Sequence, residues 1–149
     1  MAYAAYGDIE SEFKNLEFST SKALTPAEVT EFISQEEGVI NAAVSTRYDT
    51  PVTGTEAVKV LKNISIAIVA CRVAKILNLK KDIPIPAGMI PQQLNEGWAC
   101  RKAEKLLEKI QSGKVVLDDA EAVSSGQGVS SYNSDNSICP VWKRDAKQW

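Results

Sequence analysis

The chain has 149 residues, of which 44% are hydrophobic and 24% are charged, as in ordinary globular proteins of one domain with extensions. Its net charge of −2 excludes the overall basic field that attracts nucleic acid. Histidine is absent, and so are a glycine-rich phosphate loop, a nucleophile elbow and a spaced set of metal ligands. We therefore expect no catalytic, cofactor-binding or metal site.

The first third of the chain predicts two helices. Apolar residues at i, i+4 and i+7 predict a short helix over Gly7–Leu16. Thr25-Pro26-Ala27-Glu28 is a capping box with proline at the first helical position, and it opens a helix expected over Pro26–Tyr48. The outer face of this second helix is acidic, and we interpret it as a solvated face. Its carboxylates are those of Glu28, Glu31, Glu36 and Glu37.

The second helix is expected to end with Arg47 and Tyr48, just before Pro51. At a helix end a guanidinium can satisfy the last carbonyls, and a tyrosine can pack its ring while its hydroxyl stays in water. We therefore predict structural roles for Arg47, Tyr48 and Pro51. Contact with a neighbouring subunit is the alternative role for Arg47 and Tyr48.

The longest predicted helix, over Gly54–Asn78, lies at the centre of the fold. Thr53-Gly54-Thr55-Glu56 offers a second capping box at its start. From Ile64 to Leu77 apolar residues occupy nearly every side of the helix, which is typical of a helix buried by its neighbours. The helix is long enough to span a membrane, but each of its four basic residues would cost ~2.5–3.5 kcal/mol near a bilayer centre. We interpret it as a core helix and expect no membrane partner.

A proline-rich loop at residues 82–91 separates the central helix from a fourth helix over Pro91–Ser112. Gly113 is placed to end that helix in a left-handed conformation, and Lys114–Leu117 could form a short strand. The expected fold is therefore all-α, with a four-helix core over residues 1–117. Six of its residues should be mostly buried, namely Ile40, Val44, Ile64, Ile68, Cys71 and Leu107.

Three cysteines, Cys71, Cys100 and Cys139, are widely spaced and odd in number, so they fit neither a zinc site nor a disulfide framework. We expect Cys71 and Cys100 to lie on helices as small buried apolar residues. No basic apolar leader precedes the first helix, so we expect a protein that is made and kept in a cytoplasm.

The composition changes after Leu117, and residues 118–149 are predicted to form an extended C-terminal arm. Residues 120–137 are rich in Ser, Gly and Asn and too polar to form a core. Apolar residues follow among basic ones, and an exposed tryptophan favours docking on another surface. We expect residues Ala120 to Trp149 to be disordered in an isolated subunit and ordered only in an assembly. Ile138–Trp142 could add a strand to a sheet edge. The candidate anchors are Tyr132, Ile138, Val141, Trp142 and Trp149.

Four pieces of the chain follow one another in an informative order. They are Met1-Ala2-Tyr3-Ala4 with Asp8-Ile9 and Phe13, then Arg47-Tyr48 followed by Pro51, then the Ala/Ile/Val/Leu-rich central helix, then Gly113-Lys114 with Leu117. In this order and spacing, which include an R-Y-x-x-P junction between the second and third helices, the chain resembles the head–tail connector (adaptor) proteins of tailed phages, in particular their Mu-like branch. The resemblance covers the chain from its start to about Leu117.

The resemblance implies an all-α subunit of a closed homo-oligomeric ring, commonly twelve-fold, beneath the portal protein in the neck of the virion. Such a ring extends the DNA channel and offers the docking surface for the next neck or tail-completion protein. DNA would be only passing cargo, and an acidic face lining the channel would repel its phosphates. The arm would dock on the portal or on an adjacent subunit. The implied location is the virion, after synthesis in the host cytoplasm.

A small all-α binding or regulatory module, for example one that contacts nucleic acid through a helix, is the competing hypothesis. Binding to DNA usually needs several phosphate contacts. The core sequence offers no evident basic stripe, because Lys80 and Lys81 form its densest basic cluster. A measured mass in solution would distinguish a ring from a monomeric module.

Overall fold

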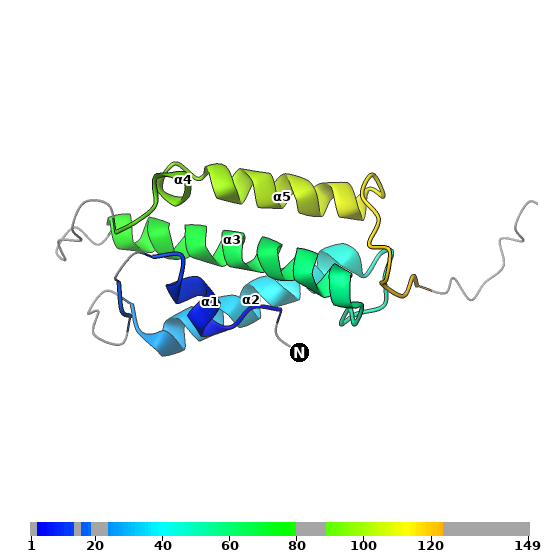
Figure 1. The fold of residues 1–149 in the computed structure, drawn as a ribbon, viewed down its shortest axis with the longest axis horizontal. Coiled ribbons are helices and arrows are strands. Elements are labelled where there is room, and N and C mark those ends of the chain that lie inside the picture. Colours follow the sequence, from blue (N-terminus) through cyan, green and yellow to red (C-terminus); the bar gives the residue numbers. More distant parts are fainter. Residues whose placement is uncertain (1–2, 14–15, 19–23, 80–88, 124–149) are drawn as a thin grey trace, which may run out of the picture.

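The computed structural model describes residues 3–13, 16–18, 24–79 and 89–123, and in these ranges the chain forms helices and no strand. The helices are α1 (Tyr6–Glu10), α2 (Pro26–Val44), α3 (Thr55–Leu79), α4 (Gln92–Asn95) and α5 (Trp98–Gln111). The predicted all-α class is therefore confirmed. Figure 1 shows α3 along the middle of the molecule, with α5 on one side and α1 and α2 on the other.

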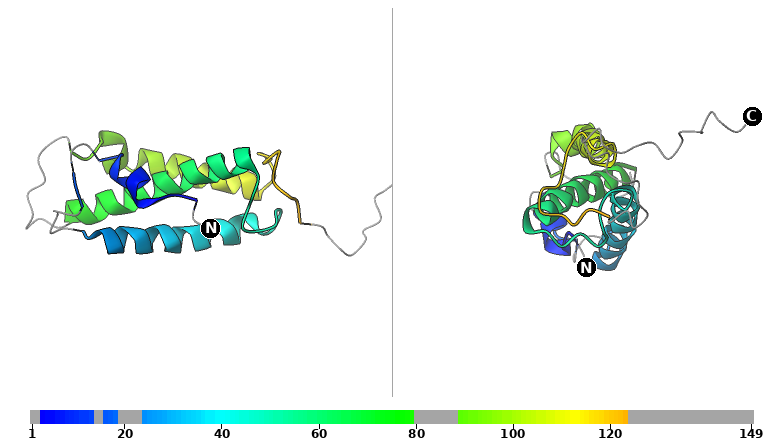
Figure 2. Two further views of the ribbon diagram at one scale, coloured as in Figure 1. Left: turned by 60° about the horizontal axis from the view of Figure 1, so that its bottom comes forward. Right: turned by 90° about the vertical axis from the view of Figure 1, so that its right-hand side faces the viewer.

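The three long helices α2, α3 and α5 contact one another, and the end-on view in Figure 2 shows them gathered around a common core. α3 is buried along its length, from Ala57 to Leu77, as its almost continuous apolar composition predicts. In the part of the chain that the structure describes, no helix is long and apolar enough to cross a membrane.

α2 begins as its capping box predicts. The Thr25 hydroxyl oxygen accepts a hydrogen bond from the Glu28 backbone N–H at 3.3 Å, and the Glu28 carboxylate accepts one from the Thr25 backbone N–H at 2.7 Å. The helix ends at Val44 rather than at Tyr48. It ends early because residues 47–49 pair their backbone with residues 121–123, and that pairing is incompatible with a continued helix.

α1 is shorter than the predicted Gly7–Leu16 helix, because the chain turns after Glu10 and buries two aromatic rings. Phe13 and Phe18 pack edge to face with their ring centroids 5.5 Å apart, and both are buried. The Glu10 carboxylate accepts hydrogen bonds from the Tyr6 hydroxyl at 2.7 Å and from the Phe18 backbone N–H at 3.3 Å. Burial and the neighbouring carboxylate raise the pKa of Tyr6 to about 12.

The predicted fourth helix, Pro91–Ser112, is divided into α4 and α5. Gly97 between them has a φ of 67°, a left-handed conformation that interrupts a helix and that glycine adopts without strain. Gly113 has a φ of 76° and follows the end of α5, as predicted. The suggestion of a strand over Lys114–Leu117 is wrong, because these residues carry no ladder pairing in the structure.

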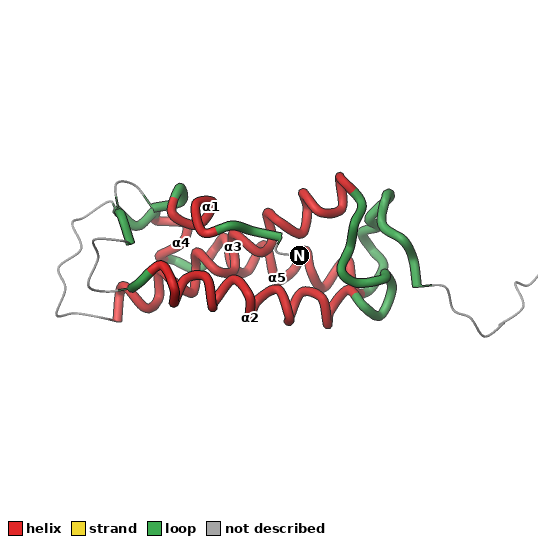
Figure 3. Tube along the Cα trace, turned by 90° about the horizontal axis from the view of Figure 1, so that it is seen from below, coloured by secondary structure: helices red, strands yellow, loops and turns green. Residues whose placement is uncertain are grey.

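The core consists of two clusters of buried residues, one toward each end of the bundle. The first, which we call the disulfide half, includes Ile9, Phe13, Phe18, Val29, Ile33, Cys71, Val73, Leu77, Leu94 and Cys100. The second, which we call the tyrosine half, includes Tyr3, Ile40, Val44, Tyr48, Val52, Leu61, Ile64, Ala103, Ile110 and Leu117. Figure 3 shows α1 and α4 at one end of the bundle, and the loops that follow α2 and α5 together at the other.

A disulfide joins Cys71 of α3 to Cys100 of α5, with their Cα atoms 5.9 Å apart. Both residues are buried, as predicted, but the expectation that they stay unbonded is wrong. They are 29 residues apart in the chain, and they meet because α3 and α5 pack side by side.

The predicted core residues divide into two groups. Ile40, Val44, Ile64 and Cys71 are buried. Ile68 and Leu107 are partly buried and pack against the margin of the tyrosine half, which agrees with the prediction that they are mostly buried. Two long neighbours cannot cover every side of α3, so part of its apolar surface stays accessible.

Candidate functional site

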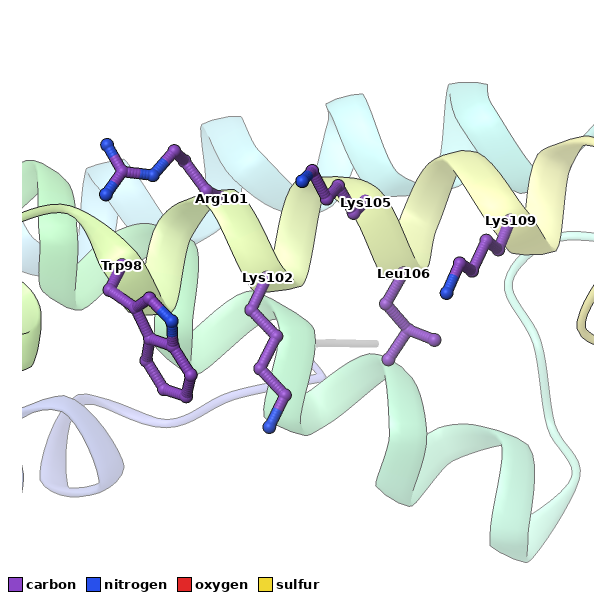
Figure 4. A pocket seen from close by; sticks show the side chains of 6 residues that line it. All are labelled: Trp98, Arg101, Lys102, Lys105, Leu106 and Lys109. Atoms are coloured by element: carbon purple, nitrogen blue, oxygen red, sulfur yellow. The ribbon is translucent and has the colours of Figure 1, made fainter.

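The outer face of α5 carries a row of cations that begins at a tryptophan, shown in Figure 4. Trp98, Lys102, Lys105 and Lys109 recur at intervals of three or four residues and therefore share one face of the helix, with Arg101 beside them. Trp98 is 50% exposed. The ammonium nitrogen of Lys102 lies 5.2 Å from the centroid of its ring, within the range of a cation–π contact. We call these five residues the basic row.

None of the carboxylates that the structure describes forms an ion pair with the basic row. The described ion pairs join Lys59 to Glu56, Lys62 to Asp8 and Arg72 to Glu36. The carboxylates of α5 itself, Glu104 and Glu108, lie along the Arg101 edge of the row, three residues after Arg101 and Lys105, but they form no ion pair in the described structure. The cations of the basic row therefore have no ion-pair partner among the described residues.

An open groove of about 340 Å³ lies beside the basic row, between α3 and α5. Its lining includes Ile64 and Ala67 from α3 and Trp98, Lys102 and Leu106 from α5. Figure 4 shows the three α5 side chains pointing toward α3. The groove thus combines apolar walls with a cationic rim.

The interpretation that the core lacks a basic stripe is corrected by this geometry. The signal was present in the sequence as the spacing of residues 98, 102, 105 and 109. Glu104 and Glu108 interrupt the run of basic letters, although on the helix they lie only along one edge of the row. Lys80 and Lys81, interpreted as the densest basic cluster of the core, lie outside the described residues.

Tyr48 and Pro51 lie in the junction where the chain leaves α2 and meets the segment that follows α5. Tyr48 is buried, and its hydroxyl oxygen accepts a hydrogen bond from the Leu117 backbone N–H at 3.0 Å. The prediction that this hydroxyl stays in water is wrong, because the chain after α5 folds back over the ring. Pro51 is exposed and follows a cis peptide bond.

Arg47 lies in the same junction with its side chain exposed. Its guanidinium lies against Gly113, where an added Cβ would overlap it. Among the described residues no hydrogen bond from this guanidinium reaches the helical carbonyls, so that prediction is wrong. The Arg47 carbonyl accepts a bond from the Val123 N–H at 2.9 Å, and the Asp49 N–H donates to the Glu121 carbonyl at 2.8 Å. Backbone hydrogen bonding to the junction therefore continues to Val123, beyond the predicted boundary at residue 117 and into the segment expected to be ordered only in an assembly.

Tyr3, which contributed to the resemblance but was assigned no role, completes the junction. Its hydroxyl donates to the Asn41 side-chain oxygen at 2.7 Å and accepts from the Val52 backbone N–H at 3.2 Å. Burial raises the pKa of Tyr3 above its ordinary value. The N-terminal segment is thereby bound to α2 and to the residue after Pro51.

Asp119 is a second residue that the sequence did not single out. Its carboxylate accepts hydrogen bonds from the backbone N–H groups of Glu56 and Ala57 at 2.6 and 2.8 Å, and so caps the start of α3. The bond from Glu56 is the main cause of an Asp119 pKa below its ordinary range. The predicted capping box at Thr53-Gly54-Thr55-Glu56 is replaced by this cap. No local signal could have identified it, because 63 residues separate Asp119 from Glu56.

The acidic face of α2 is only partly a solvated face. Glu36 pairs with Arg72 at 3.1 Å, and the Arg72 guanidinium lies 4.2 Å from the centroid of the Phe32 ring. Glu37 accepts a hydrogen bond from the Tyr3 backbone N–H. These two carboxylates are half-buried and have structural partners, whereas Glu31 is exposed as predicted.

The remaining candidate residues are the anchors of the arm, Tyr132, Ile138, Val141, Trp142 and Trp149, and they lie outside the described residues. Within the described ranges, no group of three or more His, Cys, Asp or Glu residues could hold a metal ion. Comparison of the chain with protein-family models, curated proteins and solved structures finds no match. Inference about function therefore depends on the basic row, the junction and the sequence itself.

Proposed function

We propose that the protein is a head–tail connector (adaptor) subunit of a tailed phage, which acts in a closed ring beneath the portal and has no catalytic role. The observation that carries this proposal is that residues of the family-like pattern, far apart in the sequence, converge on the junction. Tyr3 binds the backbone immediately after Pro51, and Tyr48 binds the backbone of Leu117. These residues depend on one another for their hydrogen bonds. Their order and spacing therefore characterise a fold and not a single local element.

A closed ring needs two different surfaces on each subunit, because neighbouring subunits meet head to tail. Large apolar side chains are exposed on separate elements of the described chain. Val39 of α2 is 57% exposed, and Val116, after α5, is 58% exposed. Their exposure on separate elements supports the proposal that neighbouring subunits cover this subunit at more than one place.

In this proposal the ring, commonly twelve-fold in the family, lies in the virion neck. The portal contacts one side, the next neck or tail-completion protein docks on the other, and DNA passes through the channel. The arm attaches the subunit to the portal or to an adjacent subunit. The proposed anchors are Tyr132, Ile138, Val141, Trp142 and Trp149.

The direct test is the mass of the purified protein by light scattering, together with negative-stain imaging with and without its portal. We expect a closed ring that stacks coaxially on the portal. A protein that stays monomeric and shows no added density on the portal would contradict the proposal. It would favour the second candidate, a small helical module that contacts nucleic acid, for which the basic row is the specific support.

The role of the arm is tested by truncation, and the structure decides where to cut. Truncation after Val123 keeps the bonds that residues 119–123 make to the core, whereas truncation after Leu117 removes them. We expect the first variant to keep its helical circular dichroism but to lose docking on the portal. The second variant serves as a control for damage to the fold, with a lower melting temperature. Normal joining of heads to tails by the Val123 truncation would exclude the arm as the anchor.

A further inference from the structure

The basic row has an arrangement that a helix does not favour for its own stability. Arg101, Lys105 and Lys109 are spaced at i, i+4 and i+8, so like charges lie next to each other along the helix. Pairs of like charges at this spacing destabilise an isolated helix by roughly 0.2–0.5 kcal/mol each. Glu104 and Glu108 lie three residues after Arg101 and Lys105 along one edge of the row, but they form no ion pair with these cations in the described structure. The row therefore keeps adjacent like charges without ion pairs that would offset their repulsion.

The geometry points to an extended polyanion as the ligand. From Arg101 to Lys109 the row extends about 12 Å along the helix, at 1.5 Å per residue. Three of its four cations are lysines, which are depleted in protein–protein interfaces but serve as point charges for phosphate. The Trp98 ring attracts the Lys102 ammonium through the cation–π contact. This contact holds the ammonium at the edge of the groove.

We propose that the basic row binds the phosphate backbone of duplex DNA. This inference goes beyond the role as a ring adaptor and does not depend on it, because the row is complete on one subunit. In a ring through which DNA passes, the row would hold the duplex rather than let it slide freely. The binding is independent of base sequence, because every contact is made to phosphate.

The expected affinity is modest and strongly dependent on salt. Four phosphate contacts per subunit predict a slope of about −3.6 in a plot of log K against log salt concentration, at roughly −0.9 per contact. Nonspecific binding of this kind has dissociation constants on the order of 10⁻⁴–10⁻⁶ M at physiological salt. Each lysine removed should reduce the magnitude of the slope by about one.

The test is fluorescence anisotropy of a labelled DNA duplex, titrated with the full chain over a range of salt concentrations. The variant Lys102→Gln/Lys105→Gln/Lys109→Gln should weaken binding at low salt by at least about tenfold and make the slope shallower by about three. The charge-matched control is Lys59→Gln/Lys75→Gln/Lys114→Gln, which removes three exposed lysines outside the row. It should bind like the wild type, and so should Lys102→Arg/Lys105→Arg/Lys109→Arg. Circular dichroism checks that all variants keep their helices.

Equal weakening by the row variant and the charge-matched control would overturn the proposal, because net charge alone would then explain binding. No difference between the row variant and the wild type would also overturn it, and would assign any DNA binding to other residues. A parallel titration with poly-glutamate tests the remaining alternative. If the row binds poly-glutamate but not the duplex, its partner is an acidic protein surface and the assignment to DNA is wrong.

Discussion

The two halves of the core are held together by different interactions. In the disulfide half, apolar side chains pack around a covalent bond between α3 and α5. In the tyrosine half, the hydroxyl oxygens of Tyr3 and Tyr48 accept hydrogen bonds from backbone N–H groups of distant segments, in otherwise apolar surroundings. Apolar packing tolerates exchanges that conserve volume, whereas a buried N–H group loses its partner when a single oxygen is removed. The tyrosine half is therefore less tolerant of substitution. It contains Tyr3, Tyr48 and Leu117 of the pattern that resembles the adaptor family, whereas Ile9 and Phe13 of that pattern lie in the disulfide half.

The largest effect on stability is expected from removal of the covalent bond in the disulfide half. For the 29-residue separation of Cys71 and Cys100, the chain-entropy model predicts that Cys71→Ala/Cys100→Ala lowers the free energy of unfolding by about 3–4 kcal/mol. Urea unfolding without reductant measures the difference. With reductant present, the wild type should lose a similar amount and approach the variant. A wild type that is equally stable with and without reductant would contradict the disulfide.

In the tyrosine half, Tyr48→Phe removes one oxygen and leaves the Leu117 N–H buried without an acceptor. We expect a loss of roughly 1–3 kcal/mol in the free energy of unfolding. The matched control is Tyr6→Phe, whose hydroxyl bonds to Glu10 at a half-buried position, and which should lose less. Equal losses for the two variants would mean that burial of the Tyr48 hydroxyl does not determine the loss in the free energy of unfolding.

The end of α5, where it enters the tyrosine half, can be tested with Gly113→Ala. The φ of 76° disfavours any residue with a Cβ, and the new methyl would displace the Arg47 guanidinium. A loss of roughly 1–2 kcal/mol is expected from the left-handed conformation. Gly38→Ala is the control, because Gly38 lies inside α2 with open space around it, and it should gain roughly 0.5–1 kcal/mol. A neutral Gly113→Ala would argue against the left-handed conformation.

The cap on α3 makes the stability of the junction depend on pH. The pKa of Asp119 is lowered in the fold from an ordinary value of 3.8, so its contribution is present above that value and is lost as the pH falls through the lowered pKa. Asp119→Asn should therefore be less stable than the wild type at neutral pH, and the gap should narrow as the pH falls below about 4. Urea midpoints measured from pH 7 to pH 3 would show this convergence. A constant gap would mean that the charge of Asp119 is not involved.

The smallest effect on stability is expected from the basic row, which belongs to neither half of the core. Lys102→Gln/Lys105→Gln/Lys109→Gln should change the free energy of unfolding by no more than about 0.5 kcal/mol, because the three side chains are exposed and unpaired in the described structure. Thermal melts of this variant and the wild type should nearly coincide. A large loss would show that the lysines support the fold, and the loss of DNA binding would then need another explanation.

The sequence by itself determined the elements whose causes are local. The Thr25–Glu28 capping box, the glycine that ends α5 and the apolar length of α3 all act within a few residues, and the all-α class follows from them. The basic row also belongs here, because helical spacing alone places its members on one face. In the linear sequence the row is obscured, because acidic and apolar residues separate its members.

Only the tertiary structure decided the features that depend on chain segments meeting in space. Gly38 and Gly97 are the same residue type in predicted helices, yet the first stays helical and the second turns left-handed, because the packing of each helix selects among conformations that glycine permits. The partner of Tyr48 is 69 residues away, and the cap of α3 is 63 residues from the backbone it satisfies. Local patterns report which hydrogen bonds a short segment can make on its own. They carry no information on which distant donor or cysteine the folded chain brings alongside.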